Sequence, residues 1–155
     1  MRTITKIGEV SRARYVDALL KDGDDVATVR LRVLSAAERD EIDRLYPEPA
    51  LVRAQDSEGK WYVDQTAPEY ANPLINDVIP ARKHAMVCGM LGDEFFGTDN
   101  LAEQRKVLLD TFTRDQIDSL WRQGNKSTEI TAEDLARAKD KLVPFVNAPQ
   151  AEAAT

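Results

Sequence analysis

Valine and leucine alternate with arginine over 29–33 (VRLRV), the clearest periodic pattern near the start of the chain. An alternation of this kind is typical of a strand with one buried face. The polar run KDGDD at 21–25 precedes it, and its glycine can adopt a positive φ in a turn. We therefore predict an antiparallel hairpin that pairs a strand over 10–20 with a strand over 26–34.

The hydrophobic period changes from two to about 3.6 at Ser35. Ser35 and Glu38 have the spacing of a capping box, in which each side chain accepts a hydrogen bond from the other residue's backbone N–H. Apolar residues follow at helical spacing, namely Ile42, Leu45 and Tyr46. The sequence therefore predicts a helix that starts at Ser35 and ends before Pro47, since the residue before a proline avoids helical backbone angles.

The middle of the chain predicts a second hairpin and a long helix. Residues 50–63 contain two β-prone pieces around the turn string DSEG. Asn72 followed by Pro73 is typical of a helix N-cap and first residue, so we expect a helix to begin near 73. Its second half is apolar nearly all round, which predicts the central helix of the fold. Pro80 lies inside it and predicts a kink or break at 79–80.

The carboxyl-terminal part predicts three more helices after a loop over 93–100. Their boundaries come from capping signals: a helix over about 100–111, a helix from the Thr113–Gln116 capping box to Gly124 as C-cap, and a helix from Thr131 to Pro144. The fold class is thus α+β, with an N-terminal antiparallel β-hairpin packed against four to five α-helices. We expect one globular domain over 1–145 and a disordered tail over 146–155.

Composition and charge narrow the classes of function. The 155 residues carry 21 basic and 27 acidic side chains, a net charge of −6, which disfavours a nucleic-acid partner. The amino terminus lacks a signal-peptide pattern and no stretch is long and apolar enough for a membrane span, so we expect a cytoplasmic protein without a membrane partner. Cys88 is the only cysteine, which excludes an internal disulfide.

Candidate chemistry is sparse. His84 and Cys88 lie four residues apart on a predicted helix and could face one metal ion, but a zinc site needs three or four ligands. We therefore interpret them as a packed cysteine with a boundary histidine. The sequence has no glycine-rich phosphate loop and no G-x-S-x-G motif. We expect no catalytic residues, no metal, no cofactor and no enzymatic activity.

Three aromatic residues are candidates for binding a partner protein: Phe95, Phe96 and Trp121. Phe95 and Phe96 lie between two glycines and either form an exposed anchor or fold under the core, with burial favoured because an exposed Phe loses about 2 kcal/mol of hydrophobic free energy. Trp61, Tyr62 and Trp121 leave the same choice open, and we favour the core or its rim for Trp121.

Three segments resemble, in order, the small tail assembly chaperones of long-tailed bacteriophages. They are LSAAERDEIDRLYPEP at 34–49, APEYANP at 67–73 and ARKHAMVCGML at 81–91. The sequence departs from that pattern at Ala67, where an acid often stands, and at Pro80. The resemblance implies a non-enzymatic factor of the host bacterial cytoplasm that binds the tape-measure protein, recruits tail-tube subunits and is absent from the finished particle.

Two other functions remain open at this point. The first is a structural virion protein, such as a neck, tail-terminator or decoration subunit. The second is a small enzyme or metalloprotein that uses His84 and Cys88. The sequence also leaves open whether the chain forms a homo-oligomer.

Overall fold

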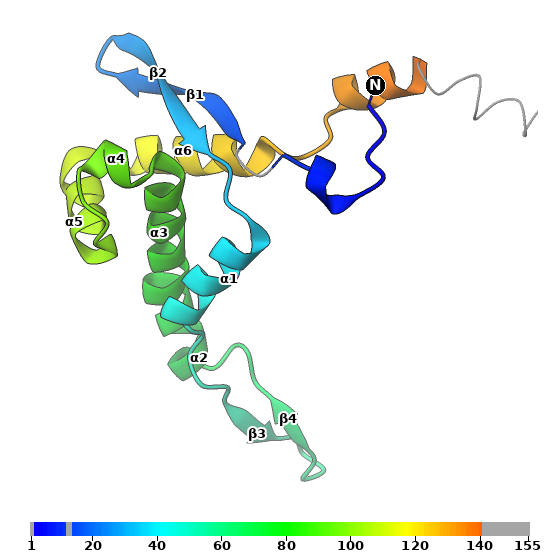
Figure 1. Cartoon of the computed structure of the whole chain (residues 1–155). Coiled ribbons are helices and arrows are strands. Elements are labelled where there is room, and N and C mark those ends of the chain that lie inside the picture. Colours follow the sequence, from blue (N-terminus) through cyan, green and yellow to red (C-terminus); the bar gives the residue numbers. More distant parts are fainter. Residues whose placement is uncertain (1, 12–13, 141–155) are drawn as a thin grey trace, which may run out of the picture.

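The structure, a computed structural model, shows an antiparallel hairpin near the amino terminus joined to a set of helices (Figure 1). The structure describes residues 2–11 and 14–140. The first hairpin consists of β1 (Tyr15–Asp22) and β2 (Asp25–Arg32), and a second one of β3 (Arg53–Gln55) and β4 (Trp61–Val63). The α-helices are α1 (Ala36–Leu45), α2 (Pro68–Pro73), α3 (Ile79–Leu91), α4 (Asp93–Phe96), α5 (Leu101–Thr111) and α6 (Arg114–Lys126). A further helix covers 132–140. The predicted α+β class is confirmed.

The predicted antiparallel hairpin forms, with Val16 opposite Leu31 and Ala18 opposite Val29, and it lies on helix α6 (Figure 1). Ala18 of β1 and Leu31 of β2 are buried on the same side. Two glutamines of α6 form hydrogen bonds to the backbone of β1. Gln123 donates to and accepts from the backbone of Leu19, both at 2.8 Å, and Gln116 donates to the Lys21 carbonyl at 2.7 Å. These bonds fix the hairpin to the helix independently of side-chain burial.

The strand boundaries differ from the prediction at both ends. β1 begins at Tyr15 rather than at residue 10, and a short 3₁₀ turn, η1 (Ile7–Glu9), lies before the predicted start. β2 ends at Arg32 rather than at residue 34, although the Val33 N–H still donates to the Arg14 carbonyl at 2.8 Å. The apolar alternation ends with the ladder: Leu34, which is out of phase with Val29 and Leu31, is buried in the core without belonging to the strand.

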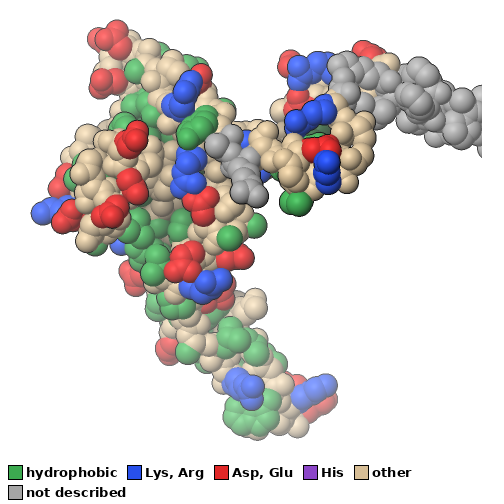
Figure 2. Space-filling model, in the orientation of Figure 1, with side chains coloured by type: hydrophobic (Ala, Val, Ile, Leu, Met, Phe, Trp, Pro, Cys, Tyr) green, Lys and Arg blue, Asp and Glu red, His purple; other side chains and the backbone are tan. Residues whose placement is uncertain are grey.

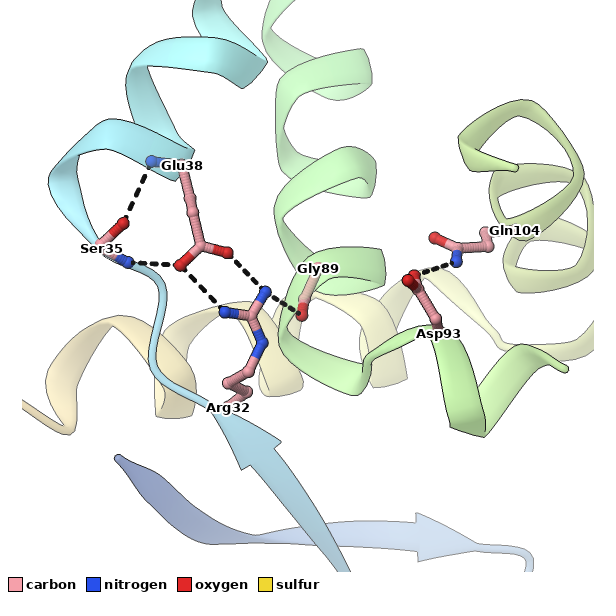
Figure 3. Close-up of polar contacts among 6 residues, drawn as sticks. All are labelled: Arg32, Ser35, Glu38, Gly89, Asp93 and Gln104. Carbon is pink, nitrogen blue, oxygen red and sulfur yellow. Dashed lines mark hydrogen bonds and ion pairs between the residues drawn. The ribbon is translucent and has the colours of Figure 1, made fainter. Parts of the chain in front are cut away.

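Helix α1 begins as the capping box predicts. The Glu38 N–H donates to Ser35 Oγ at 3.2 Å, and the Ser35 N–H donates to Glu38 Oε1 at 3.1 Å. The same carboxylate accepts from Arg32 at the end of β2, and Arg32 Nη2 also donates to the Gly89 carbonyl of α3 at 3.4 Å (Figure 3). One arginine therefore ties the hairpin, the start of α1 and the end of α3 together.

The predicted start of the long helix near 73 is wrong. Helical structure begins five residues earlier, with Ala67 as N-cap and Pro68 as first residue, and Pro73 lies inside α2. Both prolines fit a first helical turn, where a missing N–H leaves no bond unmade, so local preference does not distinguish them. The chain stays helical at Pro80, but the predicted kink or break at 79–80 coincides with a change of helix type. A π-helical segment, η2 (Leu74–Val78), leads into α3, and Pro80 falls in the first turn of α3.

Helix α3 is the central helix, as predicted. It contacts α1, α5, α6 and β2, and it contributes six buried residues: Ala81, Ala85, Val87, Cys88, Met90 and Leu91. The prediction that Gly124 caps α6 is wrong, because α6 continues to Lys126 and Gly124 is buried within it. A Cβ at Gly124 would lie 2.2 Å from Met90 Sδ. Glycine is therefore required there for the close approach of α6 to α3, not for a turn.

The loop predicted over 93–100 contains the short helix α4, and the helices that follow begin where their caps predict. Asn100 accepts from the Glu103 N–H at the start of α5, and Thr113 and Gln116 form the capping box of α6. Thr131 and Asp134 exchange the corresponding bonds at the last helix. The predicted stop at Pro144, the domain boundary at 145 and the disordered tail over 146–155 lie outside the described residues.

Candidate protein-interaction surface

The second hairpin projects from the helices near the amino-terminal end of α2 (Figure 1). It exposes large apolar side chains. We call residues 51–63 the arm. Its exposed members are Leu51, Trp61, Tyr62 and Val63, with Trp61 at 63% exposure. Figure 2 shows apolar side chains gathered on this projection, next to charged ones. None of the four belongs to the hydrophobic core.

The backbone of the arm is fixed by its turn. Asp56 Oδ1 accepts from the backbone N–H groups of Glu58 and Lys60, both at 2.9 Å, and Gly59 takes a φ of +80° that favours glycine. The Asp64 N–H donates to the Val52 carbonyl at 2.8 Å and closes the base. Hydrogen bonds therefore define the shape of the arm, while its large apolar side chains are exposed in the part of the chain that the structure describes.

The base of the arm joins a buried corner of the molecule. Ala67 and Tyr70 are buried there, and the Tyr70 hydroxyl donates to Glu48 at 3.2 Å. Arg82 of α3 donates to the Tyr46 carbonyl at 2.8 Å. The arm thus projects from a base whose flanking segments are anchored to the helices.

The three predicted partner-binding aromatics occupy different environments. Phe95 is 50% exposed, whereas Phe96, its neighbour on α4, packs against the core with the two ring centroids 5.2 Å apart. Trp121 of α6 packs at the rim of the core, with Lys83 Nζ 4.9 Å from its ring centroid. The structure brings Phe95 and Phe96 together, and Trp121 lines a separate cavity beside Arg39. The choice between an exposed anchor and burial therefore has a different answer for each residue: Phe96 packs against the core, and Phe95 is at the surface.

Phe95 lines a cavity of about 400 Å³ between the β1–β2 hairpin and the corner of α3 and α4. Tyr15 is the second exposed aromatic residue there, and Arg32 and Asp93 supply opposite charges. The position of Asp93 is set by Gln104 of α5, which is buried and donates to it at 2.8 Å (Figure 3). This cavity offers an apolar contact flanked by both signs of charge.

His84 and Cys88 lie on one face of α3 but in different surroundings. Cys88 is fully buried in the core, and burial raises the pKa of its thiol to about 12. Burial, together with Arg105 and Lys83, lowers the pKa of His84, whose Nδ1 is buried without a hydrogen-bond partner in the described structure. The interpretation of Cys88 as a packed core residue is confirmed. Within 2–11 and 14–140, no three His, Cys, Asp or Glu residues gather in a group that could hold a metal ion.

The arm adds three candidate contact residues to the predicted ones: Trp61 and Tyr62, which the sequence left open between exposed anchor and core, and Val63, which it did not single out. The signal was present in part, because WYV places large apolar side chains at consecutive positions and so on both faces of a strand. A strand of three residues buries both faces only if other elements cover it. Whether they do depends on the rest of the fold, and no element within 2–11 and 14–140 buries Trp61, Tyr62 or Val63.

None of the helices in the described ranges is long and apolar enough to cross a membrane. Comparisons of the chain with protein-family models, with curated proteins and with solved structures find no match.

Proposed function

We propose that the protein is a non-enzymatic tail assembly chaperone, which binds the tape-measure protein of a long-tailed bacteriophage in the host cytoplasm and assists tail-tube assembly. The arm is the element that contacts the client. The proposal combines the resemblance of the segments 34–49, 67–73 and 81–91 with one structural observation, the uncovered Trp61–Val63 strand.

The arm supports this proposal because its exposure is costly in the free protein. A two-stranded hairpin in water is marginally stable at best, and burying a large apolar side chain contributes about 1.5–3 kcal/mol. Trp and Tyr are also the residue types that most often dominate binding energy at protein interfaces. Contact with a client would cover Trp61 and Tyr62 and stabilise the hairpin at the same time.

The charge distribution suits an apolar client. Within the arm, Arg53 and Lys60 balance Asp56 and Glu58, so its net charge is zero while the whole chain carries −6. The arm can therefore approach an apolar stripe without net repulsion. The remaining surface, which carries the acidic excess, keeps the loaded complex apart from other copies.

A co-purification experiment tests the proposal. The tape-measure protein from the same genome is expressed together with the tagged chain, as wild type or as the double variant Trp61→Ser and Val63→Ser. The matched control is Leu19→Ser with Val26→Ser, which replaces two exposed apolar residues of the other hairpin. We expect the wild type and the control to retain the tape-measure protein and the arm variant to lose it. Retention by the arm variant would contradict the role of the arm.

Two measurements test the alternatives. Mass spectrometry of purified particles would favour a structural virion protein if the chain were present in a constant ratio to the tail subunits. Elemental analysis of protein purified without chelator would favour a metalloprotein if about one zinc per chain were bound. The proposal expects neither result.

A further inference from the structure

A groove between α3, α5 and α6, lined by none of the arm residues, has no role in the proposed function. Two adjoining cavities of about 510 and 260 Å³ share His84, Arg114 and Asp118 as lining residues. Ile75 and Ile79 line one end, and Leu109 lines the other. We call this surface, defined by these six residues, the α3–α5–α6 groove.

The apolar residues of the groove are exposed and regularly spaced. Ile75 and Ile79 lie four residues apart, at 61% and 48% exposure, and Leu109 is exposed on the opposite side. Ile75 belongs to the π-helical segment that precedes Pro80. Such segments are rare and often found at functional sites. An apolar stripe along a partner helix would match this arrangement, because residues at i and i+4 lie on one face of a helix.

The net charge of the groove lining is positive, opposite in sign to that of the chain as a whole. Lys83 lines the groove as well and pairs with Asp118, with Nζ and Oδ1 3.0 Å apart. Arg114 is exposed and forms no ion pair with any residue that the structure describes. The lining therefore carries one uncompensated positive charge, on a protein whose net charge is −6.

We propose that the α3–α5–α6 groove binds an acidic amphipathic helix of a partner protein. The apolar stripe of that helix packs on Ile75, Ile79 and Leu109, and a carboxylate beside the stripe pairs with Arg114. A basic helix would place like charges next to Arg114, which opposes binding. This groove is separate from the arm, and the inference does not depend on the tail assembly function.

Two designed peptides test this inference with the full chain. Both carry leucines at i, i+3, i+4 and i+7, one with Glu and the other with Lys flanking the stripe, and binding is measured by fluorescence anisotropy at low salt. We expect the Glu peptide to bind at least about tenfold more tightly than the Lys peptide, since the two differ only in charge. No binding of the Glu peptide, or equal binding of both, would overturn the inference.

Variants locate the binding to the groove. Ile75→Ser with Ile79→Ser should weaken the Glu peptide about tenfold or more, and Arg114→Glu should reverse the preference between the peptides. Val26→Ser, an exposed apolar residue of the β1–β2 hairpin, is the matched control and should bind as the wild type does. Sedimentation of each protein tests the other occupant, a second copy of the chain. Self-association that the isoleucine variant abolishes would overturn the partner-helix inference.

Discussion

The two hairpins of this protein both turn through a glycine, but they differ in strand length and in their surroundings. Each turns through a glycine with positive φ, Gly23 at +62° and Gly59 at +80°. Leu31 of the β1–β2 hairpin is fully buried, whereas Trp61 of the arm is mostly exposed. The β1–β2 hairpin lies on α6 and is held by its glutamines, while Leu51, Trp61, Tyr62 and Val63 of the arm are exposed and belong to no core cluster of the described residues. A turn and a strand pattern thus specify a hairpin, but packing determines whether it stabilises the fold or remains available to a partner.

The largest expected contrast comes from truncating one large apolar residue in each hairpin. Leu31→Ala should lower the free energy of unfolding by about 3 kcal/mol, because it removes a fully buried side chain and leaves a cavity. Trp61→Ala should change it by less than about 0.5 kcal/mol, because the side chain is exposed. Urea unfolding followed by circular dichroism measures both. A large loss for Trp61→Ala would mean that the arm belongs to the folding core.

The packing beneath the β1–β2 hairpin gives the next contrast. Gly124→Ala should destabilise the protein by about 1–3 kcal/mol, because the added methyl group meets Met90, itself buried in the core. Lys126→Ala, at the exposed end of the same helix, is the control and should be nearly neutral. Urea unfolding followed by circular dichroism measures the free energy of unfolding of both variants. A gain for Gly124→Ala, as expected at an open helix position, would show that α6 and α3 are not close-packed there.

The pH dependence of stability tests the ion pair that fixes the first hairpin to α1 and α3. The hydrogen bond from Arg32, with further ones from Ser35, lowers the pKa of Glu38 from its usual 4.5 to about 2, although partial burial opposes the shift. The ionised Glu38 carboxylate therefore contributes to the free energy of unfolding above about pH 4.5, and this contribution is lost as the pH falls through 2. Both side chains are about two-fifths exposed, so solvent screening limits the effect to about 1 kcal/mol.

Acid unfolding of the wild type and of Glu38→Gln measures this effect. The wild type should lose its advantage over the variant between pH 4.5 and 2, because protonation removes the carboxylate that the variant already lacks. A difference between the two proteins that stays constant over this range would show that the charge of Glu38 contributes nothing to stability.

The smallest contrast concerns the two turn glycines. Gly23→Ala and Gly59→Ala each place a side chain in the left-handed region, at a cost of about 1 kcal/mol. For Gly23 the cost should appear in global unfolding, because the hairpin unfolds together with the core. For Gly59 it should appear only as faster amide exchange within the arm. Equal losses of global stability would contradict the difference between the hairpins.

Local signals in the sequence predicted the local features of the fold. The capping boxes at Ser35 and Thr113 each need only a four-residue spacing, and both helices begin where that spacing places them. The helix start at Pro68 was missed because Pro73 satisfies the same local preference. The role of Gly124 was missed because Met90, the residue that requires it, lies 34 positions earlier in the chain and on another helix.

The candidate contact surface was predicted less well for the same reason. Exposure of Phe95 and burial of Phe96 follow from how α4 lies against the core, and adjacent identical residues give no local signal of that difference. The projection of Trp61 depends on the absence of a covering element over the arm in the described structure. Such properties arise from the assembled fold, whereas caps and strand periods arise from a few neighbouring residues.

Hydrogen exchange of the full chain, alone and in complex with the co-expressed tape-measure protein, tests the central claim most directly. In the free protein, we predict rapid exchange for amides over 53–55 and 61–63 and slow exchange for those of β1 and β2. In the complex, the arm amides should become protected while those of β1 and β2 remain unchanged. An arm that is already protected in the free protein, or that gains no protection in the complex, would contradict the account.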